Sequence, residues 1–233
     1  MLFSIVTTIS HQLIPISVVA GYLGLLLAIA EFLSRAYNTD SELTRKIVHI
    51  GTGNIILLAW WLDISRSVII LASIVASLIA IVSYFLPILP SVNGVGRKSL
   101  GTLFYAISIG GLVGLFWHEG TRQFAAIGIL VMSYGDGMAA LIGQNWGKHP
   151  YQIWGNKKSW EGSFGMTIVS LIVTVSILTF VGSWQWSYLL IALLVGIFAT
   201  ILETFSQVGI DNLTVPVGSG VITYYLLLFF NFS

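Results

Sequence analysis

The residues best suited to chemistry lie in one stretch, 136–162, which reads DGMAALIGQNWGKHPYQIWGNKKSWEG. It begins with Asp136 inside an apolar run that should be helical, where an ionisable group is costly enough to indicate a function. It ends with two adjacent lysines and a glutamate: Lys157, Lys158 and Glu161. Carboxylate oxygens can hold Mg²⁺, and lysines can neutralise phosphate charge as point cations. These residue types together predict a site for a metal-bound phosphate.

Each of these residues also has a structural explanation. If the helix ended early, near Tyr134, Asp136 would be a solvated cap. Lys157 and Lys158 are equally typical of topology-setting residues at a membrane surface, and Glu161 is typical of a helix start. The functional interpretation is favoured because both ends of the stretch are predicted to meet at one face of the membrane.

Small residues follow Asp136 at steps of three and four positions, namely Ala139, Gly143 and Gly147. On one face of a helix they would let a bulky ligand or another backbone approach closely. Taken alone, this spacing favours helix packing. The run from Gly143 to Lys148 is not a P-loop, since only three residues separate its glycines and no strand precedes it.

The composition places these residues in a membrane. Of 233 residues, 56% are hydrophobic and 8% are charged, whereas a soluble domain has about 25% charged residues. We therefore expect a single all-α domain over 1–233, a polytopic bundle of about eight transmembrane helices. Their predicted ranges are 13–33, 47–62, 67–89, 100–117, 123–143, 163–181, 187–203 and 213–232. No basic run predicts nucleic acid as a partner, and the absence of cysteine excludes disulfides and thiolate sites.

The basic residues predict the orientation of this bundle. Two of the ten, Arg66 and Arg122, fall in the even-numbered connections. The other eight fall in the first, third and fifth connections: Arg35, Arg45, Lys46, Arg97, Lys98, Lys148, Lys157 and Lys158. This bias predicts that the odd connections are cytoplasmic and that the N-terminus faces the other side. The acidic candidates Asp136, Glu161, Glu203 and Asp211 are predicted to lie near the same cytoplasmic face, where nucleotides are available.

Two further basic groups lie in the cytoplasmic connections. Arg45 and Lys46 precede His49, which could bind phosphate or act as a base; topology-setting residues and an interfacial histidine are the alternative. Arg97 and Lys98 follow a glycine-rich turn, an arrangement that suits an anion but also suits a plain surface loop.

A last group lies between the seventh and eighth predicted helices. Glu203 ends one span, and Asp211 with Asn212 begins the next. The Asp-Asn pair alone could be a helix cap. Glu203, however, has no cation near it in sequence, so its partner must be a metal, a ligand or a distant basic residue.

This ordered set resembles known lipid kinases. The residues from Asp136 to Gly162 are similar to the CTP-binding signature of dolichol kinases and related polyprenol kinases. The remaining groups resemble the phytol kinase branch: Arg45, Lys46, His49, Arg97, Lys98, Ser99, Gly101, Glu203, Asp211, Asn212, Leu213 and Pro216. Nine residues separate Gly147 from Lys157, one more than in dolichol kinases, which favours the phytol branch.

The resemblance implies transfer of the γ-phosphoryl group of CTP to a long-chain isoprenoid alcohol. Phytol would be preferred, with geranylgeraniol and farnesol as further acceptors, and the product would serve tocopherol synthesis or chlorophyll salvage. It also implies a cyanobacterial inner or thylakoid membrane, or a plastid-type one. A homo-oligomer is left open.

The resemblance also assigns roles to the residues. Asp136, Glu203 and Asp211 are the expected Mg²⁺ ligands, and Asp136, Asp211 and His49 the expected catalytic groups. The expected nucleotide-binding residues are Arg45, Lys46, Arg97, Lys98, Gly143, Gly147, Lys157, Lys158, Glu161 and Asn212.

Two other functions are compatible with the same residues. A lipid cytidylyltransferase would use them on CTP but release pyrophosphate. A transporter is a further class, since intramembrane charge often marks an ion path. The charges gather at one face rather than at the midplane, and no inverted repeat is visible, which disfavours transport.

Overall fold

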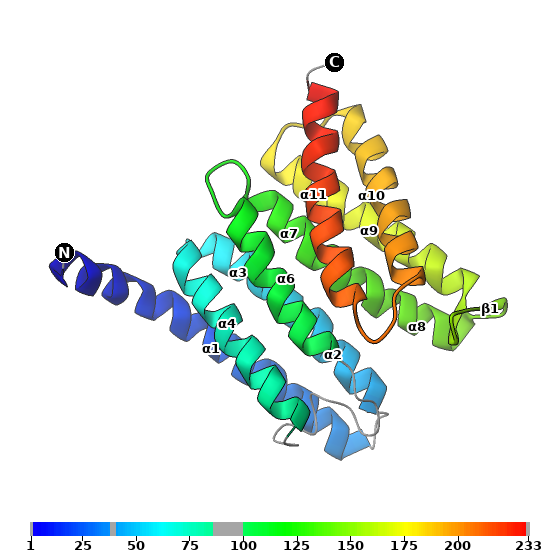
Figure 1. Cartoon of the computed structure of the whole chain (residues 1–233), viewed down its shortest axis with the longest axis horizontal. Helices are drawn as coiled ribbons and strands as arrows, with labels where there is room; N and C mark the ends of the chain where they lie inside the picture. Colours follow the sequence, from blue (N-terminus) through cyan, green and yellow to red (C-terminus); the bar gives the residue numbers. More distant parts are fainter. Residues whose placement is uncertain (1, 38–40, 86–99, 232–233) are drawn as a thin grey trace.

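The computed structural model describes residues 2–37, 41–85 and 100–231. It is a bundle of helices with one small β-hairpin (Figure 1). In chain order the elements are α1 (Leu2–Tyr37), α2 (Ser41–Gly53), α3 (Ile55–Trp61), α4 (Arg66–Phe85), α6 (Gly101–Phe116), α7 (Arg122–Leu130), the π-helix η1 (Val131–Asp136), α8 (Gly137–Trp146), β1 (Pro150–Ile153), β2 (Asn156–Ser159), α9 (Trp160–Val181), α10 (Trp186–Thr204) and α11 (Asp211–Asn231).

The expected all-α membrane class is confirmed. Six helical segments of the described chain are long and apolar enough to cross a membrane: α1, α4, the continuous α7–η1–α8 segment, α9, α10 and α11. The other two predicted spans do not form helices of that length. Helix α6 has 16 residues, and the span predicted over 47–62 is divided at Asn54, where a turn separates α2 from α3.

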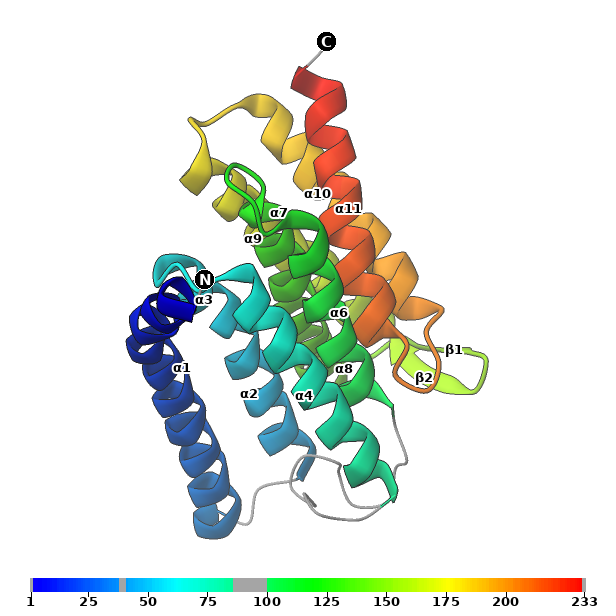
Figure 2. The same ribbon diagram turned by 60° about the vertical axis from the view of Figure 1, so that its left-hand side comes forward.

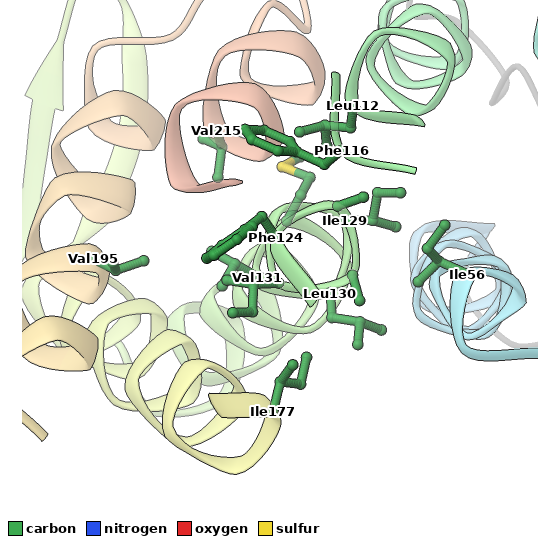
Figure 3. Packing of buried hydrophobic residues seen from close by; sticks show 14 of the residues in the cluster. Ile56, Leu112, Phe116, Phe124, Ile129, Leu130, Val131, Ile177, Val195 and Val215 are labelled. Carbon is green, nitrogen blue, oxygen red and sulfur yellow. The ribbon is translucent and has the colours of Figure 1, made fainter. Parts of the chain in front are cut away.

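The segment α7–η1–α8 forms the centre of the bundle. Helix α7 packs against α6, α9 and α11, and Ala125, Ala126 and Ile127 are fully buried. Figure 3 shows Phe124, Leu130 and Val131 of this segment surrounded by side chains from other helices. Close packing of this kind fixes a helix relative to its neighbours, so any residue on the central segment is held at a defined depth.

Asp136 ends a stretch of π-helix within this central segment. The helical backbone runs without interruption from α7 through η1 into α8. The alternative in which the helix stops near Tyr134 and leaves Asp136 as a solvated cap is therefore wrong. Single π-turns inside α-helices are frequent at functional sites, and here the extra residue per turn changes the direction in which Asp136 points relative to α7.

The polar connection before α9 contains the hairpin, which the sequence analysis did not predict. Strands β1 and β2 are antiparallel, with Tyr151 opposite Lys158. The turn residues Trp154 and Gly155 have φ angles of 48° and 87°, as a type I′ hairpin turn requires. The hairpin fixes the two lysines of β2 on a short rigid element rather than on a loose loop.

The hairpin is joined to the C-terminal part of the bundle. The Asn156 side chain donates a hydrogen bond of 3.0 Å to the Ser206 carbonyl. The Tyr151 hydroxyl lies 2.6 Å from the Ser163 hydroxyl and 3.3 Å from that of Thr204. As Figure 2 shows, the hairpin and the α10–α11 connection lie side by side.

Candidate active site

One large cavity, of about 1620 Å³, joins the predicted functional residues. It is bordered by α1, α2, α3, α4 and α6 on one side and by α8, β2 and the α10–α11 connection on the other. Ten of the predicted residues line it: Lys46, His49, Asp136, Gly143, Gly147, Lys157, Lys158, Glu203, Asp211 and Asn212. Segments far apart in the chain therefore meet at one site, as the site prediction requires.

Asp136 is paired with a lysine from a different helix. The Lys46 ammonium lies 2.6 Å from Asp136 Oδ2, and their side chains are 10% and 16% exposed. His49 Nε2 lies 4.0 Å from the same carboxylate oxygen. Lys46 and His49 are three positions apart on α2, so both face the central segment. The side of α2 that was predicted to bind phosphate thus contacts the carboxylate that was predicted to bind metal.

Glu203 is paired with Lys158 in a second close ion pair. The Lys158 ammonium contacts both the carboxylate and the backbone carbonyl of Glu203. The sequence analysis required a metal, a ligand or a distant basic residue as the partner of Glu203, and the structure supplies the last of these. Because β2 holds Lys158, the hairpin delivers this cation to the end of α10. Lys157, its neighbour on β2, is exposed and also lines the cavity.

Asp211 and Asn212 begin α11 beside these pairs. Asp211 Oδ1 accepts a 3.1 Å hydrogen bond from the Asn212 backbone amide, and the Asp211 amide donates to the Ser206 hydroxyl at 2.7 Å. The helix-cap interpretation of this pair therefore holds in part. The charges of Asp136 and Asp211 both act on Glu203, and Lys158 acts on Asp211. The three carboxylates thus belong to one electrostatic cluster.

Gly143 and Gly147 lie where α8 meets the start of α9. A side chain at Gly143 would approach Ser159 Oγ to 3.1 Å and the Gly162 Cα to 3.9 Å. Ser159 also caps α9, because its hydroxyl accepts a hydrogen bond of 3.1 Å from the Gly162 amide. The two interpretations of the small residues are therefore compatible. They allow the helices to pack closely, and they leave backbone exposed to the cavity.

The other half of the cavity is apolar. It extends from the ion pairs along α3, α4 and α6 toward the opposite end of the bundle, with Val19 of α1, Ala59 of α3 and Ile109 of α6 in its wall. His49, Thr52 and Tyr105 lie where the polar and apolar halves meet. The rings of His49 and Tyr105 are 5.0 Å apart, and the Tyr105 hydroxyl lies 2.7 Å from that of Ser133. The cavity therefore suits a molecule with a polar head and a long hydrocarbon chain.

Four predicted site residues are not placed in this cavity. Arg97 and Lys98 lie outside the described residues, as does the side chain of Arg45. Glu161 points elsewhere, with its carboxylate 2.6 Å from Nδ1 of the exposed His149. Glu161 was expected to bind the nucleotide, but its carboxylate contacts His149 and it does not line this cavity.

Several cavity residues were missed by the sequence analysis. Thr52, Tyr105, Asn156 and Ser206 all line the site. Asn156 could have been suspected, since it directly precedes Lys157. Tyr105 lies in an apolar helix without any neighbouring charge, so only the packing of α6 against the central segment reveals it.

The arrangement of the three carboxylates determines how they could bind Mg²⁺. Among the residues that the structure describes, no three His, Asp or Glu side chains come together as a preformed cage, so the expected set of Asp136, Glu203 and Asp211 does not form one. Mg²⁺ bound with a nucleotide usually takes one or two carboxylates and completes its shell with phosphate and water. Asp136 and Asp211, which face the same cavity, fit that smaller requirement.

Comparison with known proteins finds relatives that match along most of this chain. The chain is 52% identical to the phytol kinase of Synechocystis sp. over 91% of both chains. It is 31% identical to probable phytol kinase 2, chloroplastic, of Oryza sativa over 91% of this chain and 75% of the relative. It is 28% identical to phytol kinase 1, chloroplastic, of Arabidopsis thaliana over 90% of this chain and 74% of the relative. No family model and no solved structure matches the chain.

The identity to the Synechocystis protein extends over 211 residues, a length that takes in most of the helices whose side chains form the cavity. A helical membrane protein with that degree of identity along its length shares the architecture of its relative. The chain therefore belongs to the phytol kinase family.

Proposed function

We propose that this protein transfers the γ-phosphoryl group of CTP to the hydroxyl of phytol, giving phytyl monophosphate and CDP. The alcohol oxygen forms the new bond to the γ-phosphorus, the bond from that phosphorus to the β-phosphate oxygen breaks, and the hydroxyl proton passes to a base. The product would serve tocopherol synthesis or reuse of phytol from chlorophyll. The observation that carries the proposal is the single cavity with an ionic half and an apolar half, found in a member of this family.

The triphosphate would bind at the ionic half of the cavity. Lys46 and Lys158 are already held by Asp136 and Glu203, so their ammonium groups need little reorganisation to reach the phosphates. Cations fixed in a partly dry site stabilise the charge that spreads over the transferred phosphoryl group. Lys157 is the more exposed cation and suits the initial attraction of the nucleotide.

Asp136 and Asp211 would hold Mg²⁺ that arrives with the nucleotide. When bound, the ion neutralises phosphate charge and keeps the β- and γ-phosphates in a fixed arrangement. Glu203 would serve a different role, since its carboxylate orients Lys158. Asn212, beside Asp211 at the start of α11, can contribute an amide donor to a phosphate or to the base.

His49 is the proposed proton acceptor. It lies at the boundary of the polar and apolar halves, where the alcohol group of a buried prenyl chain would emerge. Its Nε2 atom is 4.0 Å from Asp136, so the carboxylate can stabilise the imidazolium that forms. With the prenyl chain in the apolar half and the nucleotide in the ionic half, the alcohol oxygen and the γ-phosphorus would meet at this boundary.

The reaction is proposed to occur at the cytoplasmic face of a cyanobacterial or plastid-type membrane. This assignment rests on the distribution of basic residues and on the chloroplastic origin named for the plant relatives. The N-terminus would then face the other side.

A product assay tests the proposal. Detergent-purified protein is given CTP, ATP, UTP or GTP with Mg²⁺ and phytol, and the products are identified by mass spectrometry. Phytyl monophosphate and CDP, formed fastest with CTP, are expected. If the protein instead releases pyrophosphate from CTP with phytyl monophosphate as substrate, it is a cytidylyltransferase. If no nucleotide is consumed with any prenol, the kinase proposal is wrong.

A further inference from the structure

The turn between α3 and α4 forms the floor of the apolar half of the cavity. Gln12 of α1 accepts a 2.9 Å hydrogen bond from the Ser65 amide, and its amide group lies 3.3 Å from the Asp63 carbonyl. These bonds tie α1 to the turn between α3 and α4. Within that turn Ile64, which lines the cavity, is 4% exposed, and its carbonyl accepts a 2.8 Å hydrogen bond from Trp117 Nε1. A chain that enters from the ion pairs can therefore extend only as far as this turn.

Helix α4 forms one wall along the length of this half. Val68, Ala72, Ala76 and Ile79 line the cavity, and steps of three and four residues place them on one face of the helix. Eleven residue steps separate Val68 from Ile79, so this face covers about 16 Å of the cavity. Helix α4 packs against α6, and Figure 2 shows the two helices running side by side.

The middle of this face is a recess. Ala72 and Ala76 are small, whereas Val68 toward the floor, Ile79 toward the ion pairs, and Leu71 and Val75 on either side of the alanines are larger. Both alanines are exposed, so they do not belong to the tightly packed core around α7. Their four-residue separation is about 6 Å along the helix, which is comparable to the length of one isoprene unit.

We infer that this recess in α4 determines which prenyl-chain length the enzyme prefers. The first isoprene unit of the alcohol lies near Ile79, and each further unit occupies the next turn toward Val68. A twenty-carbon chain fills the recess down to the floor, whereas a ten-carbon chain occupies only the part near the ion pairs. The additional burial of the longer chain supplies its preference. This inference rests on the proposed prenol acceptor.

Phenylalanine substitutions in the recess test the inference. In Ala72→Phe the ring blocks the deeper part, so the ratio of kcat/KM for geranylgeraniol to that for geraniol falls by about 10-fold or more. In Ala76→Phe, one turn nearer the ion pairs, farnesol loses its advantage over geraniol as well. The matched control is Ile74→Phe, on the same helix and 51% exposed but outside the cavity, which leaves both ratios unchanged.

A binding measurement separates this inference from the proposed reaction. Each prenol is added to the same variants without nucleotide, and the rise in melting temperature is recorded. In the native protein a longer prenol is expected to raise the melting temperature more than a shorter one. In Ala72→Phe the twenty-carbon and ten-carbon prenols are expected to raise it equally. If that pattern holds while no phosphoryl transfer occurs, the proposed reaction is wrong but the role of the recess in chain-length preference is supported. If Ala72→Phe and Ile74→Phe have the same length profile in both measurements, the inference is overturned.

Discussion

Two ion pairs of equal length lie at different depths along the central α7–η1–α8 segment, one at Asp136 and one at Arg122. Lys46 and Asp136 are 2.6 Å apart and largely buried in the cavity wall. Arg122 and Asp63 are also 2.6 Å apart, but the aspartate side chain is 78% exposed. At the second pair the Arg122 guanidinium also lies 5.5 Å from the Trp117 ring, beside the turn that forms the cavity floor. Identical distances thus occur in two different settings.

The difference lies in what surrounds each pair. Around Asp136 the structure gathers a histidine, a second lysine and two further carboxylates from four other segments: α2, β2, α10 and α11. Around Asp63 the described residues make structural contacts, such as the bond from Gln12 to the Asp63 carbonyl. Distance alone therefore does not identify a functional ion pair; the convergence of unlike charges on a cavity does.

The largest expected effect comes from removing the charge of the buried carboxylate. Asp136→Asn lowers kcat by about 1,000-fold or more, because the site loses a magnesium ligand and the partner of Lys46. The variant also leaves Lys46 partly buried without its carboxylate, so its elution in size-exclusion chromatography and its melting temperature are measured beside its kinetics. Asp63→Asn is the matched control, with unchanged kcat and a loss of stability below about 1 kcal/mol.

The next effect comes from the second ion pair in the cavity. Lys158→Met lowers kcat/KM for the nucleotide by roughly 300-fold, because a fixed cation facing the phosphates is lost. Glu203→Gln has a smaller effect, since the lysine remains but is less well held. In the double variant the two losses are not additive, because each residue acts through the other. Additive losses in steady-state kinetics would contradict a joint role.

A smaller loss is expected at the proposed base. His49→Gln lowers kcat by about 100-fold, since glutamine matches much of the shape but cannot accept a proton. The acid limb of the pH profile of kcat, which protonation of an imidazole produces, should disappear with it. A parallel loss at every pH, with the profile unchanged, would show that His49 only positions other groups.

The smallest effect is expected at Glu161. Its carboxylate is bound to His149, which is 76% exposed by side chain, and neither residue lines the cavity. Glu161→Gln therefore changes kcat and the KM for CTP by no more than roughly 2-fold. A loss comparable to that of Lys158→Met would show that Glu161 does contribute to nucleotide binding.

Most of the fold was predictable because apolar length fixes a membrane helix. The spans predicted over 187–203 and 213–232 correspond to α10 (Trp186–Thr204) and α11 (Asp211–Asn231) within two residues at each end. The division at Asn54 and the π-helix η1 were not predicted. Gly51 and Gly53, just before Asn54, are weak helix formers and could have indicated the division. The π-helix depends on how the segment packs against its neighbours. The hairpin was missed because its strands have four residues each and depend on pairing.

The site residues were predictable by type, but their partners were not. Charge in an apolar chain pointed to Asp136 and Glu203. The match of Asp136 with Lys46, ninety positions away, depends on the rotation and depth of two helices, which no local pattern records. The contact partner of Glu161 was unpredictable for the same reason. Two lysines lie near it in the sequence, but its carboxylate contacts His149.

The central claim is that one cavity holds the nucleotide at its ionic end and the prenyl chain along α4. Photocrosslinking of two twenty-carbon prenol analogues tests it most directly, one with a diazirine next to the hydroxyl and one with a diazirine at the far end of the chain. Mass spectrometry of the crosslinked peptides should place the first label near Thr52 and Tyr105 and the second near Val68 and Ala72. If both labels instead fall on the outer surfaces of α9 and α10, the account is contradicted.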